Sequence, residues 1–148
     1  MSSFHEALTS HRETLNLLNV YPVPDGDTGS NMTATLESVM AELAGVDPEL
    51  GFDAVTHAIA HGSLMGARGN SGVILSQVLR GLMGVVAEPG VDGRMVADGM
   101  AAASTAAYEA VGNPVEGTIL TVVREASEAA IEAAGAGSDL LAVAGAAR

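Results

Sequence analysis

The sequence has no cysteine and no tryptophan, and aromatic residues make up only 3% of it. Without cysteine there can be no disulfide and no thiolate metal site, so any metal ion must be bound by carboxylate, imidazole or amide groups. Ala, Leu, Val and Met supply most of the apolar content. Strands would require more β-branched and aromatic residues at a period of two. The composition therefore favours helices.

Basic residues are also scarce. The chain has 6 Lys and Arg residues against 18 Asp and Glu residues, which gives a formal net charge of −12 at pH 7. This excess of negative charge opposes binding to nucleic acid or to an anionic membrane surface, because both carry charge of the same sign. A polyphosphate ligand would meet the same repulsion, so we expect it to bind together with a metal cation.

Long apolar runs are missing as well. No segment approaches the roughly 18 uninterrupted apolar residues of a membrane-spanning helix, and the first residues lack the basic and apolar regions of a signal peptide. We therefore expect a cytoplasmic protein without membrane insertion. With 148 residues, the chain fits one domain that can bury a real core.

A turn flanked by proline and glycine carries two carboxylates, Asp25 and Asp27, just before an expected helix. Mg2+ prefers oxygen ligands and usually takes only one or two carboxylates from a protein, with water and phosphate oxygens completing its coordination. Gly26 and Gly29 permit tight or positive-φ backbone, and the N–H groups at the start of the following helix can meet an anion. The turn therefore predicts a site for a metal ion and phosphate.

Two other interpretations of this turn use the same residues. An EF-hand calcium loop starting at Asp25 would need an acidic or amide group, Gly and Glu where the chain has Gly29, Ser30 and Leu36, so the spacing excludes it. Asp25 and Asp27 could instead form only an Asx turn and a helix cap, which is a common use of Asp beside Gly. This structural alternative stays open.

Apolar periodicity predicts a series of helices separated by breaks that contain Pro and Gly. Pro22 and Pro24 prevent the first helix from continuing, Asp47-Pro48 signals a cap or a turn, and residues 88–93 are the clearest flexible break. The expected helices cover about residues 3–19, 28–45, 52–64, 73–83, 94–111 and 117–135, with a short seventh in 139–148. In the sixth, the residues expected to face inward are Ile119, Val122, Val123 and Ala126.

A second glycine-rich segment, Gly69-Asn70-Ser71-Gly72, is a loop that leads into an expected helix. Its glycines allow close backbone approach, and its amide, hydroxyl and helix N-terminal N–H groups can bond phosphate oxygens. It is neither a P-loop nor a dinucleotide fingerprint, because no Lys follows the last Gly and no strand precedes the segment. An ordinary helix–helix turn capped by Ser or Asn explains the pattern equally well.

Other polar residues give weaker signals. His57 and His61 lie one helical turn apart, but Ala58 stands where the zinc motif H-E-x-x-H needs Glu. Histidines on a helix surface are therefore the better interpretation. Arg68 can clamp a phosphate, although a single Arg in a loop more often lies in solvent or pairs with an acid.

Three runs of the sequence together resemble a known family. They are Leu18 to Met32, Leu64 to Gln77 and Asn113 to Val122. The runs are similar to the nucleotide-binding domain shared by the L subunit of dihydroxyacetone kinase and the N-terminal part of bacterial fatty acid kinase, and most closely to fatty acid kinase. Three motifs in the same order over essentially the whole chain make the resemblance far more specific than any one of them.

The resemblance implies an all-α fold, an antiparallel up-and-down helical barrel or bundle whose loops at one end hold ATP or ADP through two Mg2+ ions. Asp25 and Asp27 match the family's metal ligands, and Asn19 is the nearest counterpart of a third metal-binding Asp, at a slightly different spacing. The positions that match the family's nucleotide contacts are Thr28, Gly29, Ser30, Asn31, Gly69, Asn70, Ser71, Gly72, Thr118 and Ile119.

The resemblance also implies a function, which is ATP- and Mg2+-dependent phosphoryl transfer to an acceptor presented by a partner protein. The sequence shows no convincing general base near these loops, so the base would come from the partner. A fatty acid held by a fatty-acid-binding protein is the expected acceptor. The alternatives are a dihydroxyacetone kinase L subunit with a dihydroxyacetone-binding partner, and a non-catalytic helical nucleotide-binding or scaffold module.

The end of the sequence departs from the family. It stops before the family's last helix and the loop that closes over the ribose, so we expect a single, C-terminally truncated domain over residues 1–148. Such a domain should bind Mg-ADP or Mg-ATP weakly and show no turnover by itself, because a kinase must close over its nucleotide to exclude water. Assembly as a homodimer stays open.

Overall fold

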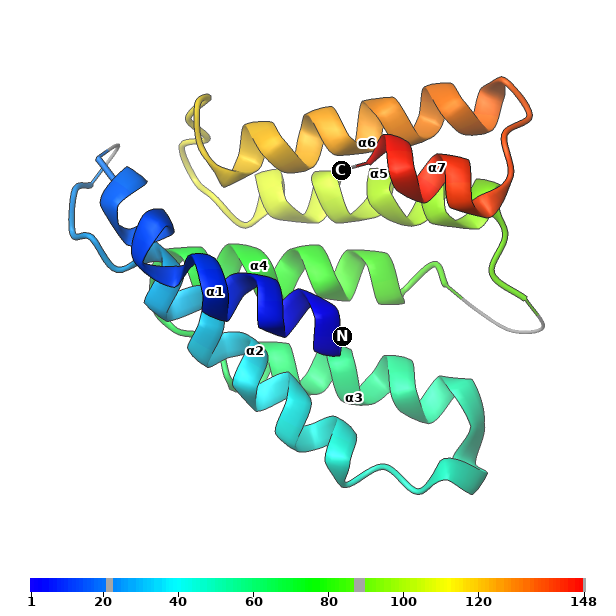
Figure 1. The fold of residues 1–148 in the computed structure, drawn as a ribbon, viewed down its shortest axis with the longest axis horizontal. Coiled ribbons are helices and arrows are strands. Elements are labelled where there is room, and N and C mark those ends of the chain that lie inside the picture. Colours follow the sequence, from blue (N-terminus) through cyan, green and yellow to red (C-terminus); the bar gives the residue numbers. More distant parts are fainter. Residues whose placement is uncertain (21–22, 87–89, 148) are drawn as a thin grey trace. The chain divides into compact units, whose positions relative to one another are not determined.

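The computed structural model describes residues 1–20, 23–86 and 90–147. All regular secondary structure in these ranges is helical (Figure 1), which confirms the predicted all-α class. None of these helices is both long enough and apolar enough to cross a membrane. The expected roles of Pro22 as a helix breaker and of Glu88-Pro89 in a flexible break lie outside the described residues.

The contacts between residues divide the chain into two compact units, Met1–Ser76 and Gln77–Arg148. The boundary falls inside one helix, α4 (Gly69–Met83). Each unit has buried apolar residues of its own. The expectations of a single domain and of a barrel stay predictions.

In the first unit, α1 (Ser2–Leu18) packs along α2 (Thr28–Ala44), and α2 packs along α3 (Gly51–Met65) (Figure 1). A short 3-10 helix, η1 (Pro48–Leu50), precedes α3. The start of α4 belongs to the same unit. The buried apolar side chains of the first unit include Leu8, Leu36, Val39, Ala58, Ile59 and Leu75.

Local sequence signals explain where these helices begin and end. α2 begins and ends close to the positions that the apolar periodicity predicted. The Asp47 side chain accepts a hydrogen bond from the Glu49 N–H (3.0 Å), and Pro48 occupies the next position. The predicted cap-and-proline signal is therefore confirmed, as the start of η1.

In the second unit, α5 (Gly93–Glu109) and α6 (Ile119–Gly135) lie side by side, and α7 (Leu140–Ala146) packs against both (Figure 1). The short α7 lies where the sequence predicted a last helix. Each of the three begins with a residue whose side chain accepts a hydrogen bond from an N–H of the first turn; these residues are Asp92, Thr118 and Asp139. The buried core contains Ala97, Ala130 and Val143.

Two details of the sequence analysis are wrong. Residues 69–72 form the first turn of α4 rather than a loop before it. Val122 does not face inward, because 65% of it is exposed, whereas Leu120 is buried. The buried face of α6 also contains the small residues Ser127 and Ala130, so large apolar side chains do not mark that face in the sequence.

Candidate functional site

The acidic turn of the first unit lies between α1 and α2. Gly26, which separates the two aspartates, has a φ of +67°, the left-handed conformation that glycine permits. Asp27 is the N-cap residue of α2, yet its side chain makes no capping hydrogen bond; its backbone oxygen accepts from the Asn31 N–H (2.8 Å). A purely structural role for Asp27 would require its carboxylate to cap the helix. The half-buried Asp27 carboxylate does not do so.

Asn19 lies beside Asp25, at the end of α1. Its side-chain nitrogen donates a hydrogen bond to the Asp25 carboxylate. A single donor on one oxygen restricts the orientation of a carboxylate and leaves its other lone pairs for a cation. The contact makes Asn19 an orienting neighbour of a predicted metal ligand, and its own ligation of the metal stays a prediction.

Asn16 lies at this candidate site and is not among the residues that the sequence predicts there. Its Oδ1 accepts a hydrogen bond from the Ser30 N–H (3.1 Å), and its Nδ2 donates to Ser30 Oγ (3.0 Å). These two bonds tie the last turns of α1 to the first turn of α2. The only signal in the sequence is an Asn among apolar residues, since it stands between Leu15 and Leu17.

Gly29 allows α1 and α2 to approach each other next to the acidic turn. A Cβ atom at this position would lie 2.2 Å from the backbone oxygen of Arg12, which is far too close for any side chain. The absence of a side chain at Gly29 therefore allows the α1 backbone to pack closely against α2. Its predicted contact with a nucleotide stays a prediction.

The start of α4 meets the start of α2 within the first unit. Gly69 has a φ of +57°, and a Cβ there would lie 2.2 Å from Asn31 Nδ2. A Cβ on Gly72 would lie 2.4 Å from Thr35 Oγ1. This buried hydroxyl accepts from the Arg68 N–H (3.1 Å) and donates to the Asn31 carbonyl oxygen (2.7 Å). The acidic and the glycine-rich motifs, which are far apart in the sequence, therefore lie together.

This arrangement suits a polyphosphate that binds with a cation. The N-terminus of a helix carries partial positive charge and unpaired N–H groups, so two such ends side by side attract an anion. At the start of α4, Asn70 is exposed and Ser71 is partly exposed, so both are accessible to a ligand. The neighbouring carboxylates supply oxygen ligands for a divalent ion that the phosphates also bind.

The third predicted motif lies in the second unit, at the start of α6. The Thr118 hydroxyl accepts a hydrogen bond from the Leu120 N–H (3.2 Å) and donates to the Val115 carbonyl oxygen (2.8 Å). The hydroxyl is thus used within the chain, and Ile119 is half-buried as the first residue of the helix. The contact of these residues with adenine stays a prediction.

The residues of the acidic turn fit Mg2+ better than a metal that needs a complete protein cage. Within residues 1–20, 23–86 and 90–147, no group of three or more His, Asp or Glu side chains could hold a metal ion. Two carboxylates and an amide match the few protein ligands that Mg2+ takes when phosphate and water complete its shell.

The histidines lie elsewhere in the first unit. The rings of His57 and His61 stack with their centroids 5.9 Å apart, and His61 Nδ1 lies 3.0 Å from Glu42 Oε1. Arg68 is exposed, and its guanidinium donates to the Ala67 carbonyl oxygen (3.2 Å). These contacts are typical of side chains on a helix surface and in a loop.

Comparison with known proteins adds two findings. The family model described as "DAK2 domain" matches residues 22–148. The chain is also 46% identical over 132 residues, 86% of its length, to uncharacterized proteins of Staphylococcus aureus, including those of strains USA300, NCTC 8325 / PS 47 and bovine RF122 / ET3-1. It spans 23% of the length of each of these relatives.

Proposed function

Because the chain belongs to the DAK2 domain family, whose members are kinase domains of the dihydroxyacetone kinase type, we propose that it binds ATP with Mg2+ for phosphoryl transfer. One observation carries the proposal for this chain. The starts of α2 and α4 lie together beside the acidic turn, through the contacts of Asn31 with Gly69 and of Thr35 with Arg68. Phosphoryl transfer depends mainly on positioning and on neutralising charge, which such a site is suited to do.

In the proposed complex, Asp25 and Asp27 hold Mg2+, and Asn19 orients Asp25 or adds its amide oxygen. When bound, the metal supplies neutralising charge and a bridge between phosphate oxygens. The first turn of α2, with Thr28 and Ser30, positions the phosphates from one side. Asn16 already accepts from the Ser30 N–H and the Asp27 carbonyl oxygen from the Asn31 N–H, so the phosphates would be met by the N–H groups of Thr28 and Gly29.

The first turn of α4 positions the phosphates from the other side. Asn70 and Ser71 add amide and hydroxyl donors to the N–H groups of this turn. Thr118 and Ile119 are proposed to contact the base. Since the Thr118 hydroxyl is bonded within the chain, the contact with the base would come mainly from the Ile119 side chain.

We also propose that the acceptor is a fatty acid presented by a partner protein, which supplies the general base. Dihydroxyacetone on its own binding subunit is the alternative acceptor. The chain spans 23% of the length of its relatives, so transfer is proposed for the whole kinase and nucleotide binding for this chain. A protein that carries this domain at the length of the relatives should phosphorylate the partner-bound fatty acid and not dihydroxyacetone.

The test of the proposed function is a calorimetric titration of the chain with ADP, with and without Mg2+. We expect binding that strengthens at least about tenfold when Mg2+ is present, because the metal removes repulsion between the carboxylates and the phosphates. Binding that ignores Mg2+, or no binding at all, would contradict the proposal. Mg2+-dependent binding without transfer to either acceptor in the longer protein would instead favour a non-catalytic module.

A further inference from the structure

Thr35 is a polar residue in the buried part of the first unit. It lies on α2, and its relative exposure is 0%. Its hydroxyl donates a hydrogen bond to the Asn31 carbonyl oxygen (2.7 Å), one turn back in the same helix, as Thr in helices often does. The same oxygen accepts from the Arg68 N–H (3.1 Å). One buried hydroxyl therefore joins α2 to the residue that directly precedes α4.

The backbone of Arg68 is fixed on both sides. Its N–H is bonded to Thr35, and its carbonyl oxygen accepts from the Gly72 N–H (2.9 Å), which is an N–H of the first turn of α4. The next residue, Gly69, has a φ of +57°. The position of Arg68 thus sets where α4 begins and where the N–H groups at its start point, since these groups have no partner within the helix.

Two glycines make room for this bridge between Thr35 and Arg68. A Cβ on Gly72 would lie 2.4 Å from Thr35 Oγ1, and a Cβ on Gly69 would lie 2.2 Å from Asn31 Nδ2. The first turn of α4 therefore lies against α2 as closely as its backbone allows. Close packing of this kind leaves little freedom for α4 to shift along α2 while the bridge is made.

Thr33 shows what a buried Thr on the same helix does without such a bridge. It is 4% exposed, and its hydroxyl donates to the Gly29 carbonyl oxygen (2.8 Å). This bond stays within α2, whereas the Thr35 hydroxyl also reaches the start of α4. The two residues therefore separate the effect of a buried hydroxyl in α2 from the effect of the bridge.

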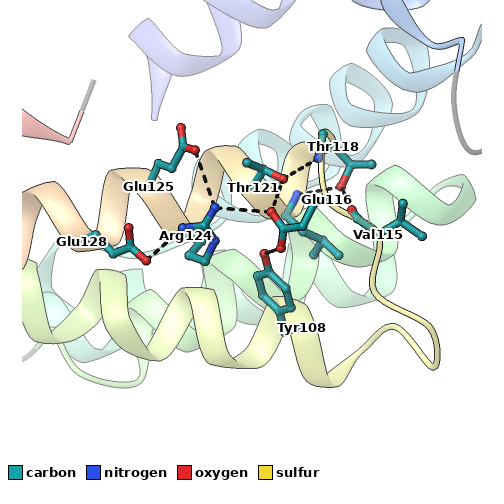
Figure 2. Close-up of polar contacts among 10 residues, drawn as sticks. Tyr108, Val115, Glu116, Thr118, Thr121, Arg124, Glu125 and Glu128 are labelled. Carbon is teal, nitrogen blue, oxygen red and sulfur yellow. Dashed lines mark hydrogen bonds and ion pairs between the residues drawn. The ribbon is translucent and has the colours of Figure 1, made fainter.

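A polar connection in the second unit differs from this bridge because it lies in solvent (Figure 2). Glu116, with a side chain that is 60% exposed, accepts from Tyr108 of α5 (2.7 Å) and from Thr121 (2.7 Å) and Arg124 (3.3 Å) of α6. The bond from Tyr108, followed by that from Thr121, lowers the pKa of Glu116, and the same bond to Glu116 raises the pKa of Tyr108. Exposed contacts of this kind are weak, because water competes for each partner. The buried Thr35 hydroxyl is shielded from that competition.

We propose that Thr35 is a positioning residue of the phosphate site, because its hydroxyl holds the start of α4 beside the start of α2 so that both helix ends meet the same phosphates. This inference rests on the proposed function. Thr35 is buried and acts through Arg68 rather than by touching the ligand. All the residues involved belong to the first unit. Serine keeps the hydroxyl and can replace Thr35, whereas valine has nearly the same shape and cannot.

The first measurement is calorimetric titration of the whole chain with Mg-pyrophosphate, which probes the phosphate site alone. Thr35→Val should weaken binding by roughly tenfold, the order of one lost hydrogen bond, and Thr35→Ser should stay within about twofold of the wild type. Thr35→Ala lacks the hydroxyl and cannot clash, so it tests the same loss if valine prevents folding. Thr33→Val is the matched control and should bind like the wild type, with circular dichroism confirming that each variant is folded.

The second measurement is hydrogen exchange of the Arg68 amide by NMR, which observes the bridge without a ligand. This amide should be protected in the wild type and in Thr35→Ser, and its exchange should accelerate by about tenfold or more in Thr35→Val. An Arg68 amide that exchanges in the wild type as fast as in an unfolded chain would show that the bridge does not form.

The two measurements separate the possible failures. If Thr35→Val and Thr35→Ala bind Mg-pyrophosphate like the wild type, or if Thr33→Val loses as much as Thr35→Val, the positioning role is wrong although the proposed function stands. If the wild type protects Arg68 but binds neither Mg-pyrophosphate nor Mg-ADP, the proposed function itself fails, and the bridge is a packing contact only.

Discussion

At the scale of single residues, Asn16 has the clearest untested role. It makes two hydrogen bonds to Ser30 at the start of α2. We expect Asn16→Ala to weaken Mg-ADP binding by about tenfold and to lower the free energy of unfolding by about 1–2 kcal/mol. Calorimetry and urea unfolding measure the two effects. Thr105→Ala, at an exposed position of α5 outside the three motifs, is the control, and equal losses in both variants would show that Asn16 has no special role.

Gly29 gives a second prediction at this scale. Ala normally stabilises a helix relative to Gly by up to about 1 kcal/mol. At Gly29, however, the added Cβ would lie 2.2 Å from the Arg12 oxygen, so Gly29→Ala should destabilise the chain by roughly 1–3 kcal/mol. Gly145→Ala in α7, where a Cβ would meet no atom within 4 Å, should be neutral or stabilising. Urea unfolding measures the free energy of unfolding of both variants. A Gly29→Ala protein as stable as the wild type would contradict the close packing.

At the scale of elements, the α5–α6 connection should make stability depend on pH. The pKa of Glu116 is lowered in the folded state, so its contribution is present above 4.5 and is lost as the pH falls through the folded pKa. The pKa of Tyr108 is raised, so its contribution is present below 10.0 and is lost as the pH rises above that value. Both groups therefore contribute at neutral pH.

The measurement is urea unfolding of the wild type and Glu116→Gln across this pH range. The wild type should exceed the variant in stability near neutral pH, and the difference should shrink as the pH falls below 4.5. Glu125→Gln should show a smaller change, since Glu125 makes one long contact with Arg124 (3.6 Å). A difference between wild type and Glu116→Gln that stays constant with pH would mean that the carboxylate's charge plays no part.

Helices were easier to predict from the sequence than the contacts between them. The bounds of α2 and the position of α7 follow from apolar periodicity and from caps, which are local signals. The Asn16–Ser30 pair and the Thr35 bridge to Arg68 require α1, α2 and α4 to be packed already. The prediction of which α6 residues are buried is wrong, because the buried face of this helix contains the small residues Ser127 and Ala130, which apolar periodicity does not mark.

At the scale of the whole molecule, the acidic turn and the start of α4 belong to the first unit, and the start of α6 to the second. The net charge of −12 should repel a free nucleotide. We therefore expect metal-free ADP to bind more tightly as salt is raised from about 50 to 500 mM, because salt screens this repulsion. Calorimetry in EDTA measures the affinity for ADP at each salt concentration. Weaker binding at high salt would point to a basic subsite.

The most direct test of the central claim is the affinity of Asp27→Asn for ADP with and without Mg2+. Asn serves as an N-cap about as well as Asp, so the variant should fold normally. If Asp27 binds the metal, Mg2+ should no longer strengthen ADP binding in Asp27→Asn, while Asp47→Asn, a matched change at the cap of η1, should behave like the wild type. An Asp27→Asn protein that binds Mg-ADP as tightly as the wild type would show that the carboxylate is not a metal ligand.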